Sequence, residues 1–227
     1  ELRKRYESLE NKYDKFLAEN YDYKANTYET NKINLLSNPT SLYAKQPTVY
    51  YGLMYLAKNA KKEVKIHTPY IICNDYMYNE LKNIKVPTTI MTNSAENNGN
   101  IFGAVDYLNH KKDIINTGVK IKEYEGGISY HGKSMTIDDD IAIVGSFNMD
   151  MRSAYIDTEL MLVINSKDIN KQLKASMEEY EKKAATVKNE TEYSHIPEGM
   201  KMKELSDKKK NIKAWFGWAM NGLRFLF

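Results

Sequence analysis

Apolar and polar positions change their period repeatedly along the middle of the chain. Residues 50–59 and 101–116 carry apolar side chains at helical spacing, and a further helix closes at Leu81. Short apolar runs typical of strands occupy 64–72, 88–92, 119–125, 129–137, 141–144 and 160–164, and a charged helix over 168–187 closes the series. Strands and helices that alternate in this order predict an α/β fold with one layered sheet.

The two ends of the chain carry amphipathic patterns of another kind. Apolar residues between Leu2 and Leu17 recur near every 3.6 positions in a predicted helix over 2–30, and Asn38-Pro39-Thr40 breaks the chain after it. We expect three parts, which are a helical linker or extension over 1–45, a domain over 46–190, and a polar linker with a basic-aromatic amphipathic C-terminal helix over 191–227.

The C-terminal pattern allows two interpretations. Lys208, Lys209 and Lys210 precede an apolar stripe that includes Trp215 and Phe216. Aromatic and basic side chains in this arrangement suit a helix lying in a bilayer interface. A C-terminal helix docked on its own domain, or on a second half of the protein, has the same pattern, so both interpretations stay open.

Composition narrows the class of protein. The 227 residues are 42% hydrophobic and 28% charged, as in ordinary globular proteins. The net charge of +3 makes nucleic acid an unlikely partner, because nucleic-acid modules are usually strongly basic. Cys73, the one cysteine, lies among apolar residues and is expected to be buried. No run of about 20 apolar residues is present, and no secretory signal is visible.

The segment HGKSMTIDDDIAIVGSFN carries the strongest chemical signal. It fixes His131, Lys133 and Asp138, followed by Gly145, Ser146 and Asn148. Six fixed positions recur by chance roughly once in 10^7–10^8 starting points. Residues i and i+2 of a strand point to one face, so His131 and Lys133 are expected to project together. With ordinary pKa values of about 6.5 and 10.4, they would place a neutral imidazole beside an ammonium.

The motif resembles the HKD signature of the phospholipase D superfamily. The likeness continues through residues 148–153 to Glu159, covers roughly residues 40–190, and is closest to the C-terminal half of bacterial cardiolipin synthase-like proteins. Thr68-Pro69-Tyr70 and Thr92-Asn93-Ser94 fit the same comparison. The resemblance implies a mixed β-sheet sandwiched between helices, a phospholipase D-like half, with helical N- and C-terminal extensions.

The resemblance also implies a role for each motif residue. His131 would attack phosphorus and carry a phosphohistidine, while Lys133, Ser146 and Asn148 would bind the phosphate oxygens. Asp138 would anchor the motif on the face away from Lys133. Glu159, which opens the strand 160–164, would hydrogen-bond the imidazole and hold its tautomer. No metal or cofactor is implied, since Lys133 and the asparagine supply the charge role.

Enzymes of this superfamily use two HKD motifs, and this chain has one. His110-Lys111-Lys112 lacks the aspartate and the Gly-Ser-x-Asn that should follow. His67 is expected to be a half-buried strand residue and His195 a loop residue, and neither can be nominated as the general acid. Either two copies pair through an isologous interface, or the chain is half of a longer protein, which the start at Glu1 favours.

The expected function is transfer of a phosphatidyl group from a phosphatidylglycerol-like lipid to an alcohol or water, at a bacterial inner-membrane or cytoplasmic surface. One alternative is a homodimeric single-HKD phosphodiesterase or nuclease, and another is a non-catalytic lipid-binding half. The partners would be phospholipid, the membrane surface through the C-terminal helix, and a second HKD half in cis or a homodimer partner. Thr68-Pro69-Tyr70 and the loop 93–100 follow strands and are expected to form the pocket wall.

Overall fold

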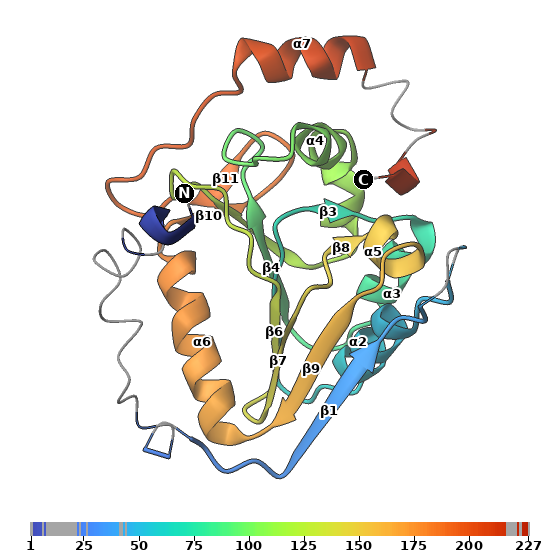
Figure 1. Ribbon diagram of the computed structural model, residues 1–227. Helices are drawn as coiled ribbons and strands as arrows, with labels where there is room; N and C mark the ends of the chain where they lie inside the picture. Colours follow the sequence, from blue (N-terminus) through green and yellow to red (C-terminus); the bar gives the residue numbers. More distant parts are fainter. Residues whose placement is uncertain are drawn as a thin grey trace.

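The molecule is built on one nine-stranded mixed sheet (Figure 1). This computed structural model describes residues 2–5, 7, 22, 24–25, 27–40, 43, 45–216, 222 and 224–226. The strands follow the order β1-β9-β7-β6-β2-β4-β5-β10-β11. Their bounds are β1 Lys32–Ser37, β2 Val64–His67, β4 Thr88–Asn93, β5 Lys120–Tyr124, β6 Ser134–Ile137, β7 Ile141–Gly145, β9 Leu160–Asn165, β10 Ala184–Val187 and β11 Tyr193–His195.

The direction of the strands changes across the sheet. β2, β4 and β5 are parallel neighbours, whereas β6 runs antiparallel to β2 and begins the antiparallel series β6, β7, β9 and β1. Several loops therefore meet at one edge, where the parallel strands end and β6 begins. Ligand sites of open α/β sheets gather at such an edge.

Helices cover both faces of the sheet (Figure 1). On one side lie α2 Thr48–Lys58, α3 Asp75–Lys82 and α4 Ile101–Asn116, together with the short α5 Met151–Tyr155. On the other side α6 Lys167–Glu181 contacts β5, β6, β7 and β10. The expected α/β class, a mixed sheet between helices, is confirmed.

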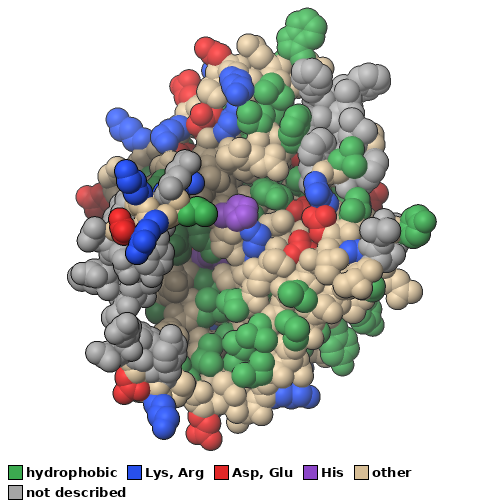
Figure 2. Space-filling model, in the orientation of Figure 1, with side chains coloured by type: hydrophobic (Ala, Val, Ile, Leu, Met, Phe, Trp, Pro, Cys, Tyr) green, Lys and Arg blue, Asp and Glu red, His purple; other side chains and the backbone are tan. Residues whose placement is uncertain are grey.

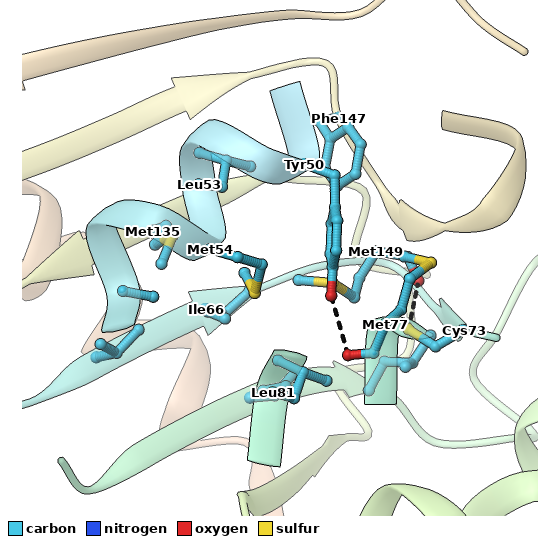
Figure 3. Close-up of a cluster of buried hydrophobic side chains, with 14 of the residues drawn as sticks. Tyr50, Leu53, Met54, Ile66, Cys73, Met77, Leu81, Met135, Phe147 and Met149 are labelled. Carbon is cyan, nitrogen blue, oxygen red and sulfur yellow. Dashed lines mark hydrogen bonds between the residues drawn. The ribbon is translucent and has the colours of Figure 1, made fainter. Parts of the chain in front are cut away.

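The main core lies beneath α2 and α3 (Figure 3). Tyr50 of α2 is fully buried, and its hydroxyl donates a 2.9 Å hydrogen bond to the backbone oxygen of Met77. Cys73 is also buried, and its thiol lies 3.7 Å from the backbone oxygen of Met149. The expected burial of the cysteine is confirmed.

The run 64–72 forms two strands instead of the single strand expected. β2 ends at His67, and β3 Ile71–Ile72 pairs in parallel with β8 Met149–Asp150 in a separate two-stranded sheet. Pro69 has no backbone N–H to continue the ladder. The Thr68 hydroxyl instead donates to the Tyr70 carbonyl, 3.1 Å, and accepts from the backbone N–H of Met149, 3.1 Å.

The edges of the sheet differ most from expectation. Residues 1–45 were predicted to be a helical extension, but they contain the strand β1. Leu2–Arg5 and Glu7 are helical, whereas residues 27–30 are not. Most of the predicted helix 2–30 lies outside the described residues. The predicted helix 168–187 ends at Glu181, and its last residues form β10. His195 belongs to the edge strand β11 and not to a loop, so the sheet also continues past residue 190.

The C-terminal segment is anchored on the domain. α7 spans Asp207–Phe216, most of the predicted helix from 217 to 227 lies outside the described residues, and Arg224–Leu226 form a 3-10 turn. The buried Lys209 ammonium donates to the backbone oxygens of Ala95, Glu96 and Asn98 at 2.8, 2.6 and 3.0 Å. Arg224 pairs with Asp106 at 2.6 Å. Within the described residues, no helix is long and apolar enough to cross a bilayer.

Candidate active site

His131 and Lys133 meet at the sheet edge where the loops gather. They lie in an extended loop segment before β6, and not on a strand over 129–137 as expected. The Lys133 ammonium lies 2.9 Å from Nδ1 of His131 and 3.4 Å from Nε2, and it donates a 2.8 Å hydrogen bond to the His131 backbone oxygen. The predicted pairing of the two side chains is thus present without the strand, because an extended segment keeps i and i+2 on one side.

A groove of about 600 Å³ opens beside this pair. A pocket of this size is in the range of small-molecule sites. Three tyrosines, Tyr124, Tyr130 and Tyr180, pack edge to face in its wall, with ring centroids 4.9–5.9 Å apart. The other lining residues are Gly126, Ile128, Ser129, His131, Gly132, Lys133, Ser134, Val144, Leu173, Ser176, Met177 and Lys183.

The expected pocket-wall residues support the groove and do not line it. Asn93, the last residue of β4, is buried and holds the segment before His131 by two hydrogen bonds. The Asn93 side-chain N–H donates to the Tyr130 backbone oxygen at 2.9 Å, and the Tyr130 backbone N–H donates to the Asn93 side-chain oxygen at 2.7 Å. The same amide donates to the Pro69 oxygen, 2.8 Å. Asn97 donates to the Ile128 oxygen, 3.2 Å. The 93–100 loop therefore fixes the position of the groove's rim.

Burial lowers the pKa of both side chains of the pair. Partial burial, and then the neighbouring Lys133 ammonium, lower the pKa of His131, which keeps the imidazole neutral at neutral pH. Burial also lowers the pKa of Lys133, while the carboxylates of Glu159 and Asp150 oppose that shift. The site thus holds a neutral imidazole beside a cation.

Behind the pair, Glu159 bridges two serines. Its carboxylate accepts hydrogen bonds from Ser146 and, at 2.8 Å, from Ser153. The expected hydrogen bond between Glu159 and His131 is not made, since in the described residues the ring bonds of His131 are with Lys133. The Glu159 carboxylate instead favours the charged form of Lys133, against the lowering of the Lys133 pKa by burial.

Asn148 sits on the same network. Its side-chain nitrogen lies 3.2 Å from the Ser153 hydroxyl, and its buried side-chain oxygen has no hydrogen-bond partner in the described structure. Neither Ser146 nor Asn148 belongs to the described lining of the groove, so the expected phosphate contacts of both residues stay predictions. Gly145, before both residues, lets β7 approach β9, because a Cβ there would lie 2.1 Å from the Leu160 backbone oxygen.

Asp150 is a site-region residue to which the sequence analysis gave no role. It caps α5 through a 2.5 Å hydrogen bond from the Ser153 N–H. Burial raises its pKa to about 6 against the opposing Ser153 bonds, with Glu159 and Asp157 adding to the rise. The Asp-x-x-Ser spacing signals a helix cap, but its burial next to Glu159 depends on long-range packing.

Asp138 lies at the opposite end of β6 from the pair. It has φ +52°, and its carboxylate accepts from the backbone N–H groups of Lys61, Lys62 and Glu63 at 2.7–3.2 Å. Burial raises its pKa, but the three backbone donors together outweigh it and the net shift is downward. The side chain therefore ties β6 to the loop before β2 and does not reach the groove.

The other histidines contact separate groups. His67 is 1% exposed, more buried than expected, and its Nε2 lies 3.2 Å from Glu181. Burial lowers its pKa against the effect of Glu181. Its ring meets the ring of Tyr130 edge to face at 5.6 Å, so it lies under the groove wall. His110 contacts Asp106 on α4.

Comparisons with solved structures define the class of fold. The chain superposes on phosphatidylserine synthase of Haemophilus influenzae with a TM-score of 0.64 at 16% identity, covering 96% of this chain and 53% of that one. It also superposes on Nuc of Salmonella typhimurium, a phospholipase D family member, with a TM-score of 0.55 at 16% identity, covering 69% and 97%. The fold is that of the phospholipase D superfamily.

Sequence comparison narrows the class to one family. Residues 53–180 match the family model described as cardiolipin synthase, PLD-like domain, and the chain belongs to that family. Cardiolipin synthase 1 of Staphylococcus epidermidis is 30% identical over 159 residues, 69% of this chain and 32% of that protein. A cardiolipin synthase of Staphylococcus aureus is 32% identical over 129 residues, which cover 56% of this chain and 26% of that protein. The chain thus spans about a third or less of these relatives.

Proposed function

We propose that this chain supplies one HKD half of a phosphatidyl-transferring site of the cardiolipin synthase type. The observation that carries the proposal is the Lys133 ammonium, 2.9 Å from the His131 imidazole, at the end of a groove whose described lining contains neither Asp nor Glu. An anionic phosphodiester fits such a surface, because it needs a nucleophile and fixed positive charge together. The names of the curated relatives support this choice of reaction.

In the first step a ring nitrogen of His131 forms a bond to phosphorus, and the bond from phosphorus to the leaving glycerol oxygen breaks. Lys133 offsets charge on the non-bridging oxygens, and the Asn148 amide donates to them, while the Ser146 hydroxyl keeps its hydrogen bond to Glu159. In the second step the oxygen of an acceptor alcohol attacks phosphorus and gives its proton to the group that protonated the leaving oxygen in the first step, and the bond to His131 breaks. The roles of Asp138 and Glu159 are to hold β6 and the serine network behind Lys133.

The departing oxygen needs a proton, and the described histidines of this chain do not supply it. His67 is buried beneath Tyr130, and His110 lies on α4. We propose that the general acid is the histidine of a second HKD motif, in cis or in a second copy of the chain. A nucleic-acid substrate is less well supported than a lipid, because the curated matches named above are cardiolipin synthases.

Turnover of phosphatidylglycerol in mixed micelles tests the proposed reaction. The full chain, His131→Ala and the matched control His195→Ala, which changes an exposed histidine on β11, are compared. We expect the control to keep the wild-type rate and His131→Ala to lose at least about 10^3-fold, as expected for a missing nucleophile. A measurable rate that is equal in wild type and His131→Ala would contradict the proposal.

We further propose that α7 rests on an anionic bilayer. Trp215 is 82% exposed, and Lys208, Lys210 and Lys213 are exposed on the same helix. Each basic side chain near such a surface contributes about 1 kcal/mol to the free energy of membrane binding, and tryptophan is enriched at the membrane–water interface. Co-sedimentation with phosphatidylglycerol vesicles should weaken in Trp215→Ala and in Lys213→Glu, while Lys112→Glu on α4 serves as a control. Unchanged sedimentation of all three would argue against this location.

A further inference from the structure

The groove at His131 continues along α6 as an apolar trough. A second hollow of about 360 Å³ shares Val144, Leu173 and Ser176 with the groove and extends between α6 and the β7–β9 part of the sheet. Its remaining lining is Ala142, Ile164, Ile169 and Gln172. Figure 2 shows this face, hollowed beside a surface where hydrophobic side chains gather.

The sequence of α6 builds one wall of the trough. Ile169, Leu173, Met177 and Tyr180 follow one another at intervals of four, four and three residues, which keeps them on one stripe of the helix. From Ile169 to Tyr180 the stripe runs roughly 16 Å. The acidic Glu178 and Glu181 point elsewhere, to Lys65, His67 and Lys122. The helix therefore separates its charges from the trough.

Charge is distributed unevenly along the trough. The ionisable basic groups of the described lining, His131, Lys133 and Lys183, belong to the wide groove, and the narrower continuation is lined by apolar residues with Gln172 and Ser176. A nucleic-acid strand would need cations along the whole path. A molecule with one anionic group and a long apolar tail matches this arrangement, in which a basic groove leads into an apolar continuation.

We propose that the trough along α6 binds an acyl chain of the lipid whose phosphodiester lies at His131 and Lys133. This inference rests on the proposed function and adds the part of the site that recognises the lipid tail. The expected gain in affinity is large, because each methylene moved out of water contributes roughly fourfold in binding.

Binding of two soluble esters to the full chain separates the tail from the headgroup. Dihexanoyl phosphatidylglycerol below its micellar concentration and glycerophosphoglycerol, which has no acyl chains, are titrated by calorimetry. We expect the acylated ester to bind at least about tenfold tighter, the gain of two buried methylenes. Ile169→Asn, at a residue that lines only the continuation of the groove, should remove this preference and leave the affinity for glycerophosphoglycerol unchanged.

Two further variants protect the interpretation. Ser176→Trp fills the trough from an exposed helix position without adding charge, and it should remove the same preference if Ile169→Asn fails to fold. Leu35→Asp changes a leucine of β1 that is 62% exposed and lines neither hollow, so the preference should survive.

The outcomes distinguish this inference from the proposed function. Glycerophosphoglycerol binding that is lost in Lys133→Met, together with an acyl preference that persists in Ser176→Trp or is absent from the wild type, would overturn the acyl site alone. Failure of the wild type to bind either ester would overturn the phosphodiester site and the acyl site together.

Discussion

At the scale of single residues, the site depends on how His131 and Lys133 affect each other. The ammonium near the imidazole disfavours protonation of the ring, and Glu159 with Asp150 behind Lys133 favours the charged amine. The hydrogen bonds of Glu159 go to Ser146 and Ser153, so its effect on His131 passes through Lys133. The proposed attack by the neutral His131 ring on an anionic phosphodiester would therefore take place next to the Lys133 ammonium.

The titration of His131 tests this mutual effect without any substrate. Because burial and Lys133 both lower its pKa, the NMR midpoint of the His131 ring should lie below the ordinary value of about 6.5. Lys133→Met removes the nearby charge and should raise the midpoint. A midpoint unaffected by Lys133→Met would show that the two side chains do not meet.

Asp138 contributes to stability, and its removal should be measurable by urea unfolding. Asp138→Ala leaves the N–H groups of Lys61, Lys62 and Glu63 without their acceptor and puts alanine at φ +52°. We expect a loss of about 1–3 kcal/mol in the free energy of unfolding. Asp139→Ala, next in sequence, removes ion pairs of an exposed carboxylate with Lys62 and Lys174 and should cost clearly less than Asp138→Ala.

The acid dependence of that stability has a definite sign. The folded pKa of Asp138 lies below its unfolded value, so its contribution is fully present above about pH 3.9 and is lost as the pH falls through the folded pKa. The stability difference between wild type and Asp138→Asn should therefore shrink as the pH falls below about 4. A difference that stays constant across this range would contradict the anchoring role of the carboxylate.

At the scale of elements, the C-terminal helix is coupled to the loops of the site. Lys209 binds the carbonyl oxygens of residues 95, 96 and 98, and the same loop holds residues 128–130 through Asn93, Asn97 and Gly99. The link from α7 to the rim of the groove is thus a short series of hydrogen bonds.

Lys209→Met should release α7. The variant leaves three carbonyl groups without their donor, so trypsin should cleave within 208–213 faster than in wild type. Lys210→Met is the matched control, since that side chain is 52% exposed and pairs only with Asp207 of its own helix. Each variant removes one trypsin site, so cleavage is compared after Lys208 and Lys213, which both variants keep. Equal cleavage rates in the two variants would show that Lys209 does not hold the helix.

The elements that could be predicted are those whose pattern is local. α4, β4, β7 and β9 follow from clear helical periods or apolar runs, and the pairing of His131 with Lys133 follows from their spacing. β1 could not be predicted, because Ile33 and Leu35 are exposed and its place depends on pairing with β9, 123 or more residues away in sequence. β10 and the support given by Asn93 depend on similarly distant contacts.

At the scale of the whole molecule, apolar side chains of the described sheet are exposed beside the groove. The chain carries one motif and spans about a third or less of the curated relatives it matches. The sheet face beside the groove leaves Ile33, Leu35 and Leu160 exposed at 52%, 62% and 47%. A second HKD half could cover apolar side chains of this kind while adding its own histidine.

The most direct test of the central claim is to find the atom that bonds to phosphorus. Bis(4-nitrophenyl) phosphate is suitable, because its leaving group departs without a general acid from a second motif. After an alkaline quench, mass spectrometry should locate a 4-nitrophenyl phosphoryl adduct on the His131 peptide of wild type and of His195→Ala, and none on that of His131→Ala. An adduct on another residue, or equal nitrophenolate release by His131→Ala, would contradict the account.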